Sequence, residues 1–232
     1  MITKRRIIIG GYDTAEHGWT LSACKLTKGQ QVQNFVSVPG RYAPLDLSTY
    51  LTDGQPYYGN AVLNVTLECS EGTRDQRQTR IDLMVNALDG RNWQIIHPDH
   101  PGRYLFGRVQ VSAPDYNDNA HCAIKLSAVC EPWLYNAAET VTRVTLPANT
   151  SNELSVELVN SGRLAVTPTL KVTGEVIVKQ GENRQALSAG TWVLPWLHLV
   201  PAEGFNESAT YLLTCSGTGT IEFVYREAVL AV

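Results

Sequence analysis

The stretch that decides the fold is Thr73 to Gly90, TRDQRQTRIDLMVNALDG, because it carries helix start and stop signals in a chain that otherwise alternates like β-strand. Thr73 is followed three residues later by Gln76, the spacing of a capping box, in which both side chains satisfy backbone groups of the first turn. Gly90 suits the left-handed position that follows a last turn. The sequence therefore predicts one long helix over about residues 73–89.

One face of this predicted helix is apolar at the spacing of a 3.6-residue period, through Ile81, Met84, Val85 and Leu88. Burying each of these side chains is worth roughly 1.5 to 3 kcal/mol, far more than intrinsic helix propensity, so the stripe requires a β-sheet to pack on. The first two turns, Arg74 to Arg80, are polar all round, and we expect them to project beyond that sheet. Leu83 lies opposite the stripe, either exposed singly or covered by a neighbouring subunit.

Composition indicates an ordinary soluble globular protein. The chain has 232 residues, of which 44% are hydrophobic and 18% charged, enough for one large β domain or, as we prefer, two smaller ones. No apolar run suits a signal peptide or a membrane span. Five cysteines without a C-x-x-C pair predict free, buried thiols in a reducing cytosol. The net charge of −3 and the lack of a basic patch argue against nucleic acid as a primary partner.

The chain before the helix contains a long irregular stretch. Val32 to Val38 is predicted as a strand that ends at Pro39-Gly40, and Lys28-Gly29-Gln30 is predicted as the turn before it. Beyond Gly40, prolines and an Asp-Gly pair interrupt the pattern until Ala61 to Cys69, which alternates like a half-buried strand. Such a stretch inside a compact domain is typical of an interaction loop or an extended arm.

After the helix, short strands and turns follow one another to the end of the chain. Strands are predicted over 93–96, 104–111 and 123–129, the first two joined by the loop HPDHPG, and the composition changes around 131–138. The second half alternates between turns that contain glycine, at 160–162, 181–183 and 217–219, which favours an antiparallel sandwich without a helix. The sequence therefore predicts a mainly β protein with domains at 1–135 and 136–232.

Several segments together carry a resemblance to a known family. In the first half they are PGRYAPLDLS (39–48), YGN (58–60), PGRYLFGRV (101–109) and CEPWLY (130–135); in the second half they are NSGRLAVTPTLKVTG (160–174) and GTGTIEFVYREAVL (217–230). Their order and spacing resemble the distal tail protein (Dit) of long-tailed, siphovirus-type bacteriophages. The resemblance runs from about Val36 to the end of the chain.

The resemblance implies an architecture and a role. The N-terminal domain would be a tail-tube-like β-sandwich or split barrel with one α-helix, and the C-terminal domain a galectin-like or carbohydrate-module-like β-sandwich. Six copies would form a ring, the structural hub of a tail tip or baseplate, that joins the tail tube protein to the tip or tail-associated protein. The protein would lie at the distal end of the virion tail and would be assembled in the cytoplasm of the bacterial host. Neither a membrane nor a cofactor is implied.

The residues that we expect at subunit interfaces lie in the irregular stretch, on the outer helix face and on one strand: Arg41, Leu45, Asp46, Leu47, Tyr57, Tyr58, Leu83 and Arg108. For Leu45 and Leu47 the alternative is packing into their own domain. For Arg108 the alternatives are a solvated charge and a bidentate ion pair across an interface.

Particular residues raise two other classes of function, an enzyme or metal site and a sugar-binding module. His97-Pro98-Asp99-His100 could offer metal ligands, but a third ligand at a suitable spacing is missing, so a hairpin loop with exposed polar residues is the better interpretation. Nucleophile and phosphate-binding motifs are absent from the sequence, and we predict no enzyme activity. Trp192 and Trp196 could stack on sugar rings, or at least one could fill the core. A carbohydrate-binding, lectin-like module for adsorption to the host cell wall is therefore the alternative function.

Overall fold

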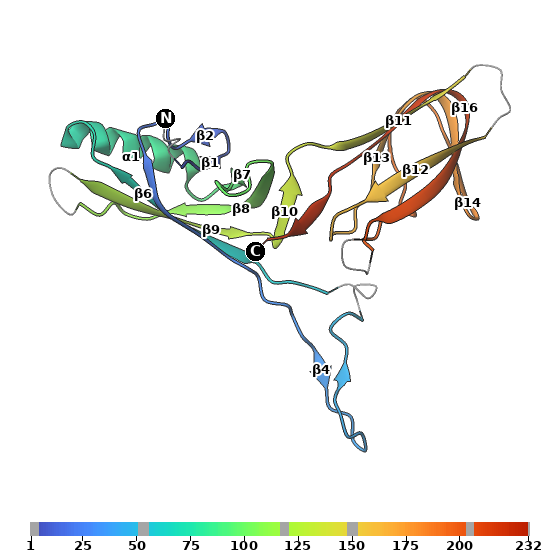
Figure 1. The fold of residues 1–232 in the computed structure, drawn as a ribbon, viewed down its shortest axis with the longest axis horizontal. Helices are drawn as coiled ribbons and strands as arrows, with labels where there is room; N and C mark the ends of the chain where they lie inside the picture. The colour runs from blue at the N-terminus through green and yellow to red at the C-terminus, as the bar shows by residue number, and fades with distance from the viewer. Residues whose placement is uncertain (1–4, 51–55, 117–120, 148–152, 203–206, 232) are drawn as a thin grey trace. The chain divides into compact units, whose positions relative to one another are not determined.

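Main-chain contacts organise the protein into two units, which a computed structural model describes over residues 5–50, 56–116, 121–147, 153–202 and 207–231 (Figure 1). The first unit consists of residues 1–134 with 230–232, and the second of residues 135–229. The chain passes from one unit to the other within β10 (Trp133–Asn136) and returns within β17 (Ala228–Leu230). The last described residues thus belong to the first unit, although the sequence pattern assigned them to the second.

The first unit is built on a nine-stranded sheet in which β2, β1, β7, β8, β9, β6 and β3 follow one another in space, with β10 and β17 off this path. The strands are β1 (Ile8–Ile9), β2 (Tyr12–Asp13), β3 (Thr20–Thr27), β6 (Ala61–Cys69), β7 (Asn92–Ile96), β8 (Arg103–Val111) and β9 (Cys122–Cys130). In β6 the predicted alternation is confirmed, since Leu63, Val65 and Leu67 are buried. One face of the sheet is therefore core.

The helix α1 (Arg74–Leu88) covers that core face (Figure 1). Of the predicted stripe, Ile81, Met84 and Leu88 are buried and Val85 is partly buried, and both hydrogen bonds of the Thr73–Gln76 capping box are present. Beyond the last turn, Gly90 adopts φ +72°, and its N–H donates to the Val109 carbonyl oxygen at 2.9 Å. This hydrogen bond attaches the end of the helix to β8, so the sheet holds the helix in place.

The start of the helix differs from expectation, because Arg77 is buried although the first two turns were predicted to project beyond the sheet. Its Nη1 donates to the Gly72 carbonyl oxygen at 2.5 Å, and Arg80 Nη1 contacts the Cys69 sulfur at 3.0 Å and donates to the Glu71 carbonyl oxygen at 3.2 Å. Both guanidinium groups therefore bond the loop that precedes the helix. The polar residue types of these turns predicted exposure and gave no sign of this role. An arginine can be buried where its N–H groups donate to backbone carbonyl oxygens.

The second unit is a six-stranded antiparallel sheet whose strands curve around one core (Figure 1). Its strands are β11 (Thr140–Leu146), β12 (Leu154–Asn160), β13 (Thr169–Gln180), β14 (Asn183–Leu187), β15 (Gly190–Val193) and β16 (Ala209–Tyr225). The first part of β16 pairs with β12 and the last part with β11, while β13 pairs with residues 214–224 of β16. Among the residues described in this unit there is no helix, as predicted.

The segment Gly217-Thr218-Gly219 was predicted as a turn, and this was wrong, because it lies inside β16. Gly174, Gly217 and Gly219 all have positive φ, and a Cβ on Gly219 would lie 1.7 Å from the Thr173 carbonyl oxygen. These glycines let β13 and β16 bend where β16 changes partners. The core beneath includes Leu158, Leu170, Val178 and Phe223, all fully buried.

The five cysteines are all free, and Cys24 is the one that is not fully buried. Burial raises the thiol pKa of Cys130 and of Cys215 to about 12, and that of Cys24 to about 11. At neutral pH these thiols are therefore protonated and poorly reactive.

Candidate interaction surface

Between β3 and β6 the chain makes a long excursion, which we call the arm and define as residues 30–50 and 56–58 (Figure 1). Its two ends meet at a narrow base. The Gly59 N–H donates to the Gln30 carbonyl oxygen at 2.8 Å, and the Val32 N–H donates to the Tyr57 carbonyl oxygen at 2.9 Å. The two backbone segments by which the arm leaves the sheet and returns to it are thus adjacent and hydrogen-bonded to each other.

Beyond the base, the arm is a two-stranded ribbon of β4 (Phe35–Val36) and β5 (Leu45–Asp46). The predicted strand over 32–38 is therefore reduced to two residues. The Asp46 carboxylate accepts a hydrogen bond from the Ser48 N–H at 2.9 Å, and its bonds to Ser48 hold the carboxyl pKa below its ordinary value. At the tip, Gly40 adopts φ +84° and the Arg41 N–H donates to the Val38 carbonyl oxygen at 3.1 Å.

The arm carries large hydrophobic side chains that it does not bury. Seven of them are at least 38% exposed: Val32, Phe35, Val36, Val38, Tyr42, Tyr50 and Tyr57. Arg41 and Asp46 are the charged residues in the described part of the arm, and their charges are opposite. A two-stranded ribbon is marginal in water unless another layer covers it, and contiguous exposed apolar surface marks an interaction site. The arm therefore has the physical character of a segment that packs against a partner.

The structure distributes the predicted interface residues over three places. On the arm, Arg41, Asp46 and Tyr57 are exposed, whereas Leu45, Leu47 and Tyr58 are partly buried. The Tyr58 ring packs edge-on against Trp133 with centroids 6.1 Å apart, and the Lys28 Nζ lies 5.4 Å from its centroid. Tyr58 thus belongs to the base of the arm.

The other two predicted interface residues lie away from the arm. Leu83 is 58% exposed on the outer face of α1. Arg108 is exposed on the sheet face opposite the helix, and it forms no ion pair with any residue that the structure describes. Leu83 and Arg108 therefore mark separate surfaces of the first unit.

On the open face of the sheet, apolar side chains that the sequence analysis did not single out lie beside Arg108. Val129 is the cross-strand partner of both Val62 and Arg108, and all three are exposed, as is Phe106 two residues before Arg108. The alternation of β6, β8 and β9 places these residues on the outer face, but sequence alone does not show that they lie side by side. This face combines the guanidinium of Arg108 with apolar neighbours, a composition typical of interfaces.

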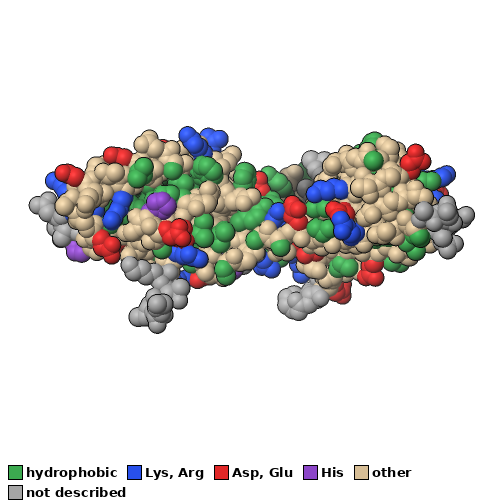
Figure 2. All heavy atoms as spheres, turned by 90° about the horizontal axis from the view of Figure 1, so that it is seen from above, with side chains coloured by type: hydrophobic (Ala, Val, Ile, Leu, Met, Phe, Trp, Pro, Cys, Tyr) green, Lys and Arg blue, Asp and Glu red, His purple; other side chains and the backbone are tan. Residues whose placement is uncertain are grey.

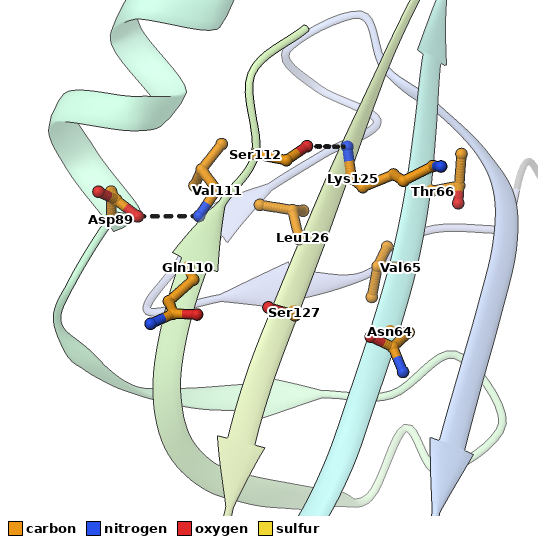
Figure 3. A pocket seen from close by; sticks show the side chains of 10 residues that line it. All are labelled: Asn64, Val65, Thr66, Asp89, Gln110, Val111, Ser112, Lys125, Leu126 and Ser127. Atoms are coloured by element: carbon orange, nitrogen blue, oxygen red, sulfur yellow. Dashed lines mark hydrogen bonds between the residues drawn. The ribbon is translucent and has the colours of Figure 1, made fainter. Parts of the chain in front are cut away.

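A hollow of about 690 Å³ is lined by β6, β8, β9 and the end of α1 (Figure 3). Asn64, Gln110, Lys125 and Ser127 are among its lining residues, while the Asp89 carboxylate accepts a hydrogen bond from the Val111 N–H at 2.8 Å. The amides and the hydroxyl can donate and accept hydrogen bonds, and the ammonium group can donate them.

The loop His97-Pro98-Asp99-His100 is a hydrogen-bonded turn. His97 Nδ1 accepts from the Asp99 N–H at 3.1 Å, and the Asp99 carboxylate pairs with Arg5 at 2.5 Å. Contrary to the expected exposure, His97 is buried, and its Nε2 lacks a hydrogen-bond partner in the described part of the chain. No group of three His, Cys, Asp or Glu side chains within the described ranges could hold a metal ion. Desolvation lowers the His97 pKa, against the opposing effect of Asp99.

The two tryptophans that were sugar-contact candidates differ in their surroundings. Trp196 is partly buried and packs against the core of the second unit. Trp192 is 37% exposed, lines a cleft, and donates from Nε1 to the Ser188 carbonyl oxygen at 2.9 Å. The expectation that at least one of the two contributes to the core therefore fits Trp196.

On the face drawn in Figure 2, basic and acidic side chains are interspersed and do not form a single basic patch. No helix of the described residues is long and apolar enough to cross a membrane.

Comparison with known proteins gives a likeness of fold. No protein-family model matches the sequence, and a comparison with curated proteins gives no match. Among solved structures, the chain is similar to the Dit protein of SPP1, described as a paradigm of the hub adsorption apparatus in phages that infect Gram-positive bacteria. The two share 15% sequence identity with a TM-score of 0.66, over 97% of this chain and 99% of the other. The resemblance read from the sequence is thus confirmed for the mainly β, Dit-like fold.

Proposed function

We propose that this chain is a structural hub of a phage tail tip or baseplate, where six copies form a ring that joins the tail tube protein to the tip or tail-associated protein. The observation that carries the proposal is the arm, a ribbon of exposed apolar side chains with no core of its own. The likeness in fold to a phage hub protein supports the same role.

The arm favours contact with a neighbouring copy over contact with a charged ligand. Its described residues carry one positive and one negative charge, so burial on another protein surface costs little in desolvation of charges. A contact in which an arm fits a different surface of the next copy is heterologous, and such contacts close into a ring when the rotation permits. Leu83 and Arg108, on separate surfaces of the first unit, are the residues that we propose for the receiving side or for the neighbouring rings.

The proposed role involves assembly and no catalytic step. It places the protein at the distal end of the virion tail, after assembly in the bacterial host cytoplasm. Neither nucleic acid nor membrane is a partner in this proposal, and no cofactor is part of it.

Ring formation is tested by native mass spectrometry and negative-stain imaging over a range of protein concentrations. The protein is measured first by itself and then mixed with the purified tail tube protein of the same phage. The second condition is needed because a ring that forms on a tail can be monomeric in isolation. We expect six-fold rings in at least one condition. A strict monomer in both conditions would overturn the proposal.

A pair of matched variants tests the arm. Phe35→Ser removes an exposed aromatic ring from the arm and should abolish or strongly weaken ring formation. Leu212→Ser removes a side chain that is 65% exposed in the second unit and should leave the rings intact. Equal assembly by the two variants would contradict a role of the arm in ring closure.

A further inference from the structure

We propose that Cys69 and Cys122 form a disulfide bond when the protein meets a small thiol oxidant, and that this bond joins two interior strands of the first unit. In the structure both thiols are free and buried. The strand register places them directly opposite each other, Cys69 at the end of β6 and Cys122 at the start of β9. These two strands are neighbours within the nine-stranded sheet.

Direct pairing brings the two cysteines within reach of one covalent bond. Residues directly opposite in an antiparallel pair have Cα atoms about 4.5 or 5.5 Å apart, and both distances lie in the range that a disulfide spans. Both side chains point to the buried face of the sheet. Opposed Cβ atoms are about 4.5 to 5.5 Å apart, against about 3.5 to 4.5 Å in a disulfide, so closure needs a movement of roughly 1 Å.

No other two cysteines are opposed in this way. All five cysteines lie among the described residues. The remaining three have only apolar residues or glycine as cross-strand partners, and they are Cys24, Cys130 and Cys215. The pairing of β6 with β9 therefore selects one disulfide out of those that the sequence would allow.

The groups around the two sulfurs give them different parts in the reaction. The Nη1 of Arg80 donates to the Cys69 sulfur at 3.0 Å, and a guanidinium beside a sulfur stabilises negative charge on it. Burial raises the pKa of the Cys122 thiol, and the neighbouring Cys69 raises it further. Cys69 is therefore the thiol that attacks the oxidant, and Cys122 is the thiol that completes the bond.

With oxidised glutathione as the oxidant, the bond forms in two exchange steps. The Cys69 thiolate attacks one glutathione sulfur, which gives a mixed disulfide and releases one glutathione. The Cys122 sulfur loses its proton, attacks the Cys69 sulfur and releases the second glutathione. Two S–H bonds of the protein and one S–S bond of the oxidant break, and one S–S bond forms in the protein. Two protons and two electrons pass to the two glutathione thiols.

The position of the pair at a strand end gives an oxidant access to it. Residues 70–72, which follow Cys69, are exposed, and so is His121, which precedes Cys122. Strand ends beside exposed segments open more readily than strand centres do. The buried sulfurs therefore become accessible through local opening, without unfolding of the whole unit.

The bond constrains a long part of the first unit. The chain between the two cysteines contains α1, β7 and β8, and a disulfide restricts the unfolded chain more strongly when it closes a longer loop. Under the proposed function, the protein is made in a reducing cytoplasm and then works outside the cell, where disulfides persist. This timing rests on the proposed function, whereas the bond itself does not.

The test oxidises the full-length, folded protein with oxidised glutathione and then counts the remaining thiols by alkylation after denaturation and mass spectrometry. We expect the count to fall from five to three, with a proteolytic peptide that links Cys69 to Cys122. The melting temperature of the helix signal in circular dichroism should rise by at least about 5 °C, and dithiothreitol should reverse the change. Cys122→Ala should lose no thiols on oxidation, whereas Cys24→Ala should still lose two.

Three results would each overturn the inference. They are five thiols that remain after oxidation, a linked peptide that joins other cysteines, and equal melting temperatures of the oxidised and reduced forms. The peptide map of the wild type needs no variant, so it decides the outcome even if Cys122→Ala fails to fold. Ring formation is measured separately on reduced protein, so failure of the hub proposal and absence of the disulfide give different outcomes.

Discussion

Gly29 and Gly59 lie against each other at the base of the arm, where a Cβ on Gly29 would be 1.9 Å from the Gly59 carbonyl oxygen. No side chain can occupy that position unless the two backbone segments separate. The close approach of these two glycines therefore lets the two ends of the arm lie side by side where they join the sheet. The hydrogen bond from the Gly59 N–H to the Gln30 carbonyl oxygen links the two ends.

The first prediction concerns this contact. Gly29→Ala should open the base of the arm at a cost of about 1 to 3 kcal/mol, the usual range for inserting a methyl group into closely packed structure. Hydrogen exchange at the Gly59 and Val32 amides, both donors at the base, should become at least about tenfold faster. Gly102→Ala is the control, since a Cβ there meets nothing within 4 Å. Unchanged protection in Gly29→Ala would contradict the prediction.

A second prediction addresses the helix start. Thr73→Ala removes the hydroxyl that accepts from the Gln76 N–H at 3.3 Å and should lower the free energy of unfolding by about 1 kcal/mol. Urea unfolding followed by circular dichroism at the helix wavelength measures it. Thr79→Ala is the matched change, because Thr79 lies inside α1 and its hydroxyl donates to the Asp75 carbonyl oxygen of the previous turn. Equal destabilisation by both variants would show that the cap contributes nothing specific.

The third prediction is a dependence of stability on pH. Desolvation holds the pKa of buried His97 below its ordinary value of 6.5, so the unfolded chain takes up a proton that the folded chain resists. Folding stability should therefore fall as the pH drops below about 6.5, with the loss continuing down to the folded-state pKa. Asp99, His100 and Arg5 also act on this ring.

The contribution of His97 can be isolated by His97→Asn, which keeps an acceptor for the Asp99 N–H and removes the titrating ring. Unfolding free energies measured between pH 5 and pH 7.5 should decline less steeply for the variant than for the wild type. Parallel curves would mean that His97 titrates alike in the folded and unfolded states.

A fourth prediction concerns the core of the second unit. The fully buried Asn160 donates from Nδ2 to the carbonyl oxygens of Leu164 at 2.9 Å and Leu199 at 2.7 Å, and it accepts from the Gly162 N–H at 2.9 Å. Asn160→Asp keeps the shape but loses the two donations, and should destabilise by about 3 kcal/mol or more. Asn183→Asp, at an exposed position, is the matched control. Similar melting temperatures for the two variants would refute the assigned role.

Local sequence was sufficient for the elements whose signals lie within a few residues. The capping box at Thr73, the left-handed Gly90 and the apolar stripe from Ile81 to Leu88 predicted the helix, and strict alternation predicted β6. In each case the signal that predicts the element is a hydrogen bond or a periodicity within that element. The irregular composition of 40–60 likewise predicted an interaction loop or an extended arm, because it lacks the periodicity that any packed element needs.

Contacts between distant residues decided the rest. Asn160 is polar in sequence but buried in the structure, because its Nδ2 donates to the carbonyl oxygen of Leu199, 39 residues further along the chain, as well as to that of nearby Leu164. Gly217 and Gly219 look like a turn, yet they bend a long strand because Glu175 and Thr173 of β13 pass against them. The cleft at Trp192 exists only through the pairing of β13 with β14, β15 and β16. Sequence fixes what each segment can form by itself, whereas which backbone satisfies a buried donor, and where a ring is left uncovered, depends on the register between strands.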